Sequence, residues 1–217
     1  MAVDRVKGAA GLPAGALRIG TAAGLTSRLE RGIDSLRRAA TALDVVLVDL
    51  PVAARLDALR QGDLDLALAR GVVSAPGLTV LPTWTEPLLA VVSTRHTAAD
   101  HAVAGLAELA GSVLRIPSRQ LDPPLHDAVT TALRDAGIRP RLGRPAGTPR
   151  DTIVEVGSDP DSWAVLPAGQ VGEIGSARVR AIPLEPPVTI TGSVVIPEDL
   201  PRPCASAHVA AFRDTTS

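Results

Sequence analysis

Eight residues that follow apolar, strand-like stretches are candidates for binding a small molecule. They are Thr21, Ala22, Ala23, Arg70, Ser118, Arg119, Gln120 and Thr148. Thr21 comes directly after a predicted strand and Ser118 two residues after another, where the chain turns toward the next element. Backbone N–H groups at the start of a helix are unpaired and carry a partial positive charge, which suits a carboxylate or another small anion. Arg70 and Thr148 end a strand and a loop, and are the weaker candidates.

The residue patterns of common enzyme classes are missing from the sequence. It contains no Gly-x-Ser-x-Gly elbow, no Gly-x-Gly-x-x-Gly, no phosphate-binding Gly-Lys-Ser/Thr and no His-Glu-x-x-His. His96 and His101 lie in a predicted loop and are interpreted as surface or hinge residues, and Cys204 as a buried small hydrophobe. We therefore assign no catalytic residue, no metal ligand and no cofactor, and predict that the chain is not an enzyme.

The composition restricts the partners further. The chain has 22 Lys and Arg against 23 Asp and Glu, so it lacks the basic excess of a nucleic-acid-binding domain. A single cysteine cannot form an internal disulfide, and residues 1–16 have no apolar segment typical of a signal peptide. No stretch approaches the roughly 20 apolar residues of a membrane span. These features predict a cytoplasmic protein that contacts neither DNA nor a membrane directly.

Apolar spacing predicts alternating strands and helices in the first part of the chain. After a strand at Ala16–Gly20, leucines spaced three, four and seven residues apart predict a helix to about Ala42. Its arginines lie away from the buried face and are interpreted as solvated: Arg28, Arg31, Arg37 and Arg38. Val45–Leu50 is predicted to be a buried strand. A helix after Pro51 is predicted to end at Gly62, and a strand covered on both faces to follow.

The same reasoning predicts the later elements. Asp122 and Pro123 are typical of the cap and first turn of a helix, which is predicted to run through Ala136. The other expected elements are a short helix at Gly105–Ala110, a strand at Val113–Ile116, a short helix at Thr152–Gly157, strands at Gly77–Trp84, Glu86–Ser93, Arg139–Leu142, Trp163–Leu166, Arg178–Ile182 and Thr189–Ile196, and a helix at Pro203–Thr215.

One stretch, Leu56–Ala69, closely resembles the second helix and third strand of the effector-binding domain of LysR-type transcriptional regulators. Further stretches resemble that domain in the right order: Leu17-Arg18-Ile19-Gly20, Glu86–Val92 followed by His96, Val103-x-x-Leu106-x-x-Leu109-Ala110, Val154-x-x-Gly157 and Ala164-Val165-Leu166-Pro167. The resemblance covers about residues 16–213. The chain departs from the family pattern at Thr97, where the family commonly has proline.

The resemblance implies an α/β fold with two Rossmann-like lobes of the type 2 periplasmic-binding-protein kind, joined by two hinge crossings. Lobe I would comprise residues 16–93 and 192–217, and lobe II residues 94–191. Residues 1–15 would be a flexible leader or the remnant of a linker. In the family the effector lies between the lobes. The resemblance therefore implies that Thr21 and Ser118 are the first candidates for contact with the effector, and Arg119 the next.

The function implied by the resemblance is that of a sensor. It would bind a small metabolite, expected to be a carboxylate, and transmit lobe closure through a homodimer. In the family the dimer is antiparallel, so Leu25–Ala42 and Val52–Arg60 would pack against the partner's second lobe. DNA would be contacted only through a winged helix-turn-helix, which this sequence lacks. The alternatives are a free-standing solute-binding protein of the same fold and, third, an enzyme built on it.

Overall fold

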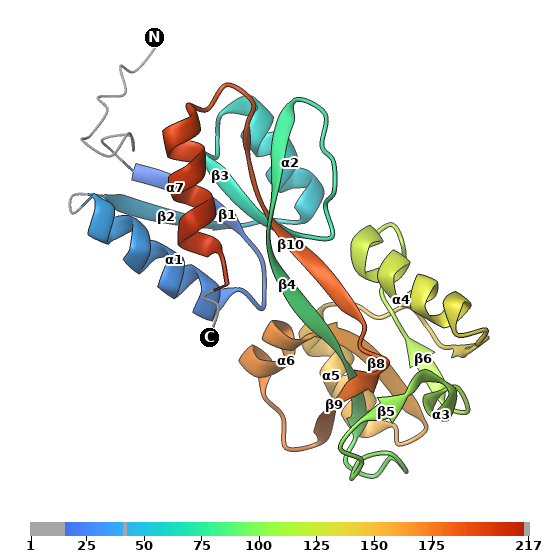
Figure 1. Ribbon diagram of the computed structural model, residues 1–217. Helices are drawn as coiled ribbons and strands as arrows, with labels where there is room; N and C mark the ends of the chain where they lie inside the picture. Colours follow the sequence, from blue (N-terminus) through green and yellow to red (C-terminus); the bar gives the residue numbers. More distant parts are fainter. Residues whose placement is uncertain (1–15, 41–42, 215–217) are drawn as a thin grey trace. The chain divides into compact units, whose positions relative to one another are not determined.

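The computed structural model describes residues 16–40 and 43–214, which form two compact α/β units (Figure 1). Unit 1 contains the described residues up to Thr85 and from Thr191 onward, and unit 2 contains Glu86–Ile190. The chain passes from one unit to the other within strand β4 (Leu78–Ser93) and again within β10 (Thr189–Pro197). The leader expected at residues 1–15 lies outside the described residues.

Unit 1 is built on a mainly parallel sheet with the order β2-β1-β3-β10-β4. Besides parts of β4 and β10, its elements are β1 (Ala16–Thr21), α1 (Thr26–Ala39), β2 (Asp44–Asp49), α2 (Val52–Gln61), β3 (Leu66–Arg70) and α7 (Arg202–Phe212). Because β1 runs parallel to both β2 and β3, the carboxyl ends of all three lie at one edge of the sheet. Thr21 and Arg70 are therefore brought to the same edge.

The predicted helix stop at Gly62 and the buried strand after it are confirmed. Gly62 has a φ of 76°, the left-handed conformation that glycine adopts without strain, and it caps α2. Leu66 and Leu68 of β3 are fully buried. Asp65, just before the strand, accepts hydrogen bonds from the backbone N–H and the guanidinium of Arg18. This ion pair raises the pKa of Arg18, chiefly through the hydrogen bond to Asp65.

Two expectations for unit 1 are wrong. Val45–Leu50 was expected to be buried, but β2 is an edge strand paired only with β1, and Val46 and Leu47 are 43% and 48% exposed. Arg28 was expected to be solvated, but its guanidinium lies 4.4 Å from the ring centroid of Trp84. Both errors concern neighbours that are distant in the sequence. The helix expected to reach Ala42 ends at Ala39, and residue 42 itself is outside the described part.

Unit 2 carries a second sheet region in which the latter half of β4 pairs with β8 and β9. Its other elements are β5 (Ala104–Gly105), α3 (Leu106–Leu109), β6 (Val113–Arg115), α4 (Pro123–Asp135), β7 (Arg141–Leu142), α5 (Pro149–Ser158), β8 (Ser162–Pro167), α6 (Ala168–Ile174) and β9 (Val179–Glu185). The predicted cap of α4 is confirmed, since the Asp122 carboxylate accepts from the backbone N–H of Leu125 at 3.1 Å. Helix α6 was not predicted.

The sequence-based division of the chain differs from the compact units. The lobe boundaries were expected at residues 93 and 191, whereas the units divide at residues 85 and 190. Two separate apolar stretches were expected on either side of Thr85, but β4 is one continuous strand through both. In the described part of the chain, no helix has the length and apolar character needed to cross a membrane.

Candidate functional site

The loop after β1 contains three of the sequence-predicted site residues. Thr21 ends the strand and is buried, and its carbonyl accepts from the backbone N–H of Leu50 at 3.4 Å. Its hydroxyl does not cap the following helix, because α1 begins after Leu25 without any side-chain cap. Gly24, at φ 83°, makes the turn between the strand and the helix. The start of α1 therefore presents backbone groups rather than a capping side chain.

Arg70 holds this loop in place. From the end of β3, its Nη1 donates to the carbonyl of Ala23 at 2.9 Å, and its Nη2 donates to the carbonyl of Gly24 at 2.7 Å. The structure thus brings Arg70 to Thr21, Ala22 and Ala23, although it lies more than 40 residues further along the chain. Sequence reasoning placed Arg70 at this edge of the sheet but missed its role as the organiser of the loop. No local pattern reveals which carbonyls a long side chain will reach.

In unit 2, the loop after β6 is brought close to the loop before α5. Pro117 and Ala146 form a parallel β-bridge, and the Ala146 N–H donates to the carbonyl of Ile116 at 2.9 Å. Ser118 and Thr148 follow these bridge residues by one and two positions. Ser118 is half-buried, and its carbonyl accepts from the N–H groups of Leu121 and Asp122. The bridge therefore groups the predicted site residues of unit 2.

Two of the unit 2 candidates have structural roles that were not predicted. Arg119 is 71% exposed and pairs with Asp127, with 2.9 Å between Nε and Oδ1. Hydrogen bonds from Arg119 and then from His126 lower the pKa of Asp127. Thr148 caps α5, since its hydroxyl accepts from the Asp151 N–H at 3.2 Å and donates to the Asp151 carboxylate at 2.7 Å. Gln120 is exposed beside them.

One of the histidines, His96, is buried and held by hydrogen bonds. His96, interpreted as a surface or hinge residue, is 6% exposed, and burial lowers its pKa. Its Nδ1 accepts from the Ala98 N–H at 3.0 Å, and its Nε2 lies 2.9 Å from the Ser112 hydroxyl. Within residues 16–40 and 43–214, no three His, Cys, Asp or Glu side chains are grouped so that they could hold a metal ion.

Comparisons with known proteins agree on one family. The model of the LysR substrate binding domain matches residues 10–217. The reduced OxyR regulatory domain from Pseudomonas aeruginosa is 18% identical, with a TM-score of 0.72 over 91% of this chain and 97% of that one. The effector-binding domain of a BenM variant is 21% identical, with a TM-score of 0.75 over 91% and 93%. Comparison with curated proteins finds no match.

A third similar structure is that of CbnR, a LysR family transcriptional regulator. It is 19% identical, with a TM-score of 0.77 over 93% of this chain and 71% of that one. At such identities the likeness to solved structures establishes the fold alone. That fold is the type 2 periplasmic-binding-protein kind, as the sequence predicted.

Proposed function

The chain belongs to the LysR substrate-binding-domain family, and on that premise we propose that it senses a small metabolite bearing a carboxylate. It is an effector-binding regulatory domain in a family of transcriptional regulators, and we assign it no enzymatic role. The observation that carries the proposal is the tie between Arg70 and the loop after β1. A cytoplasmic location is part of the proposal, supported by the family and by the single cysteine of the chain, Cys204, which is buried.

The Arg70 contacts preorganise backbone donors in unit 1. In a trans peptide, the C=O and the following N–H point in opposite directions. Because the carbonyl of Gly24 faces the Arg70 guanidinium, the N–H group of Leu25 points away from it. This N–H group lies at the positive end of α1. A loop held in this way suits an anion without a rearrangement on binding.

In unit 2 we assign effector contact first to Ser118. Its half-buried hydroxyl has no hydrogen-bond partner in the described part of the chain. Arg119 and Thr148 already pair with carboxylates, so binding a ligand would cost them those contacts. Gln120 remains a secondary candidate.

Dimer formation is the second part of the proposal. The edge strand β2 carries the exposed side chains of Val46 and Leu47. In the chain, β2 lies between α1 and α2, the two helices that we expect at the interface. Unit 2 carries further exposed apolar side chains, Leu142 at 69% and Val154 at 63%. Apolar residues on an exposed sheet edge favour association. We propose a homodimer in which α1, α2 and this edge contact the partner's second unit.

The ligand proposal is tested by thermal unfolding against small carboxylates, aromatic acids, amino acids and phosphorylated metabolites. A ligand at 100 times its dissociation constant adds about 2.7 kcal/mol, which shifts the midpoint by roughly 5–10 °C at this chain length. The shift should be lost in Thr21→Ala and in Ser118→Ala but kept in Ser206→Ala, which removes an exposed hydroxyl from α7. If no carboxylate shifts the midpoint, or if all three variants behave alike, the proposal fails.

The dimer is tested by sedimentation velocity. We expect the parent protein to sediment as a dimer at high concentration, and Leu47→Glu to sediment as a monomer, because the new charge lies at the proposed edge. Val73→Glu is the matched control, since Val73 is 86% exposed on a loop outside the proposed interface. A parent protein that stays monomeric at high concentration would contradict the proposal.

A further inference from the structure

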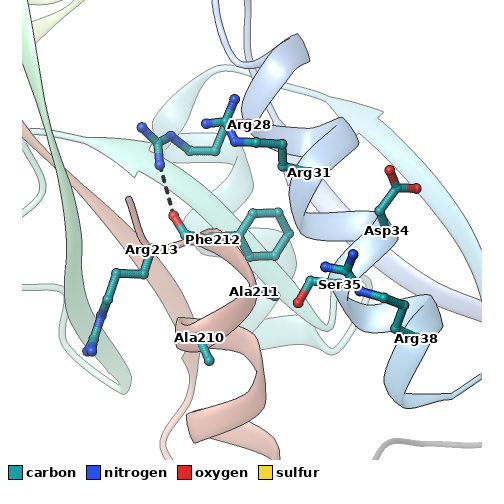
Figure 2. Close-up of a pocket in the computed structure, with 9 residues that line it drawn as sticks. All are labelled: Arg28, Arg31, Asp34, Ser35, Arg38, Ala210, Ala211, Phe212 and Arg213. Carbon is teal, nitrogen blue, oxygen red and sulfur yellow. Dashed lines mark hydrogen bonds between the residues drawn. The ribbon is translucent and has the colours of Figure 1, made fainter. Parts of the chain in front are cut away.

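A second concave surface lies in unit 1, between α1 and α7 (Figure 2). It encloses about 280 Å³, and four arginines line it together with one aspartate. The arginines are Arg28, Arg31, Arg38 and Arg213. We call this surface the arginine pocket. It is separate from the loop after β1 described above.

Helix geometry explains why the charges gather there. Arg28, Arg31, Ser35 and Arg38 are spaced three, four and three residues apart, so they share one face of α1. Gly32 lets α7 approach this helix closely, because a Cβ at that position would lie 2.1 Å from the Phe212 ring. Phe212 is buried beneath the arginines. The pocket therefore combines an apolar wall with a cationic rim.

The four arginines differ in how they are held. Arg28 is fixed, since it donates to the Phe212 carbonyl at 2.9 Å and pairs with Asp214 at 2.7 Å. Arg31, Arg38 and Arg213 are exposed and have no carboxylate partner among the described residues. In Figure 2, Arg31 extends toward Arg28, Arg38 turns toward Ser35, and Arg213 points away. Asp214 neutralises Arg28 and Asp34 adds one negative charge, so positive charges remain in excess at the pocket, which is unfavourable unless an anion neutralises them.

We propose that the arginine pocket binds a small molecule through an oxyanion group, either a phosphate or a carboxylate. Arg31 and Arg38 donate to its oxygens, while Ser35 supplies a neutral hydrogen-bonding group. Guanidinium groups match such oxyanions with paired hydrogen bonds. The small volume of the pocket favours a compact metabolite over a protein segment, and a net charge of −1 disfavours a nucleic acid. This inference is independent of the effector proposal.

Titration calorimetry with inorganic phosphate, and separately with citrate, tests the inference at constant ionic strength. We expect saturable binding of at least one of the two anions. The anion that binds shows whether the pocket favours a phosphate or a carboxylate group. Arg31→Ala combined with Arg38→Ala should weaken that binding by at least about tenfold, because it removes two charged donors. Arg37→Ala removes an arginine from the same helix but outside the pocket, and should change binding by less than about twofold.

Two results would overturn the inference. One is heat that does not saturate with either anion, and the other is an equal loss of binding in Arg37→Ala, which would indicate general charge attraction. The Thr21→Ala variant separates this site from the proposed effector site, since it should leave phosphate or citrate binding here intact. Thermal unfolding of every variant without ligand checks that the fold is kept.

Discussion

In unit 2, side chains cap the helices that follow the candidate loops, whereas none of the helices described in unit 1 is capped by a side chain. Asp122 caps α4 and Thr148 caps α5. Helices α1, α2 and α7 begin instead after Leu25, Pro51 and Pro201. The loop after β1 is organised by Arg70 through its carbonyl groups. Polar side chains thus stabilise the starts of α4 and α5 in unit 2, while only backbone groups are found at the start of α1 in unit 1.

The two units also differ in the histidines that they bury. His208 of α7 is 1% exposed, and neither ring nitrogen has a hydrogen-bond partner in the described part of unit 1. The buried His96 of unit 2 has contacts at both nitrogens. An unpartnered buried group costs free energy, and its charged form costs more. Unit 1 should therefore be the more sensitive of the two to acid.

The largest effect is expected from the titration of His208. Burial lowers its pKa from 6.5 to about 4, against a smaller opposing influence of Asp65. Between these values the unfolded chain binds the proton and the folded chain does not, so stability falls as the pH drops from about 6.5 to about 4. The loss approaches about 3 kcal/mol.

Chemical denaturation of the parent protein and of His208→Leu at several pH values measures this difference. In His208→Leu, the free energy of unfolding should fall much less between about pH 6.5 and about pH 4 than it does in the parent protein. His101→Leu, at a half-exposed histidine of unit 2, should retain the fall of the parent protein. If the free energy of unfolding depends on pH equally in the parent protein and in His208→Leu, the expected difference in acid sensitivity between the units is wrong.

A smaller effect is expected when the arginines of the two candidate loops are removed. Arg70→Ala should lower the free energy of unfolding by about 2 kcal/mol, because two carbonyls lose a charged donor. Arg119→Ala should cause no measurable change, because its pair with Asp127 is exposed. Urea denaturation measures both variants. A similar loss in the two would show that Arg70 does not organise its loop.

The smallest effect is expected at the helix starts. Asp122→Ala should destabilise unit 2 by about 1 kcal/mol, since it removes the cap of α4. Ser27→Ala, in the first turn of α1, should change stability by less than about 0.5 kcal/mol, because Ser27 is exposed and no side chain caps that helix. Thermal unfolding of both variants at pH 7 tests this. A larger loss in Ser27→Ala would show that a side chain supports the start of α1 after all.

The sequence by itself determined the features that depend on local interactions. The helix stop at Gly62 and the cap at Asp122 could be predicted because backbone conformation and capping involve only a few neighbouring residues. The buried leucines of β3 could be predicted from their unbroken apolar run. The order of these motifs along the chain also indicated the family.

Only the tertiary structure decided features that depend on distant neighbours. The exposure of Val46 and Leu47 follows from the place of β2 at the sheet edge, which its apolar sequence does not reveal. The hydrogen-bond partners of Arg28 lie 184–186 residues away in the chain, and those of Arg70 lie 46–47 residues away. The residue type of Thr148 suits a ligand contact and a helix cap equally well, so the sequence does not distinguish the two roles. A long or polar side chain can reach many partners, and packing selects among them.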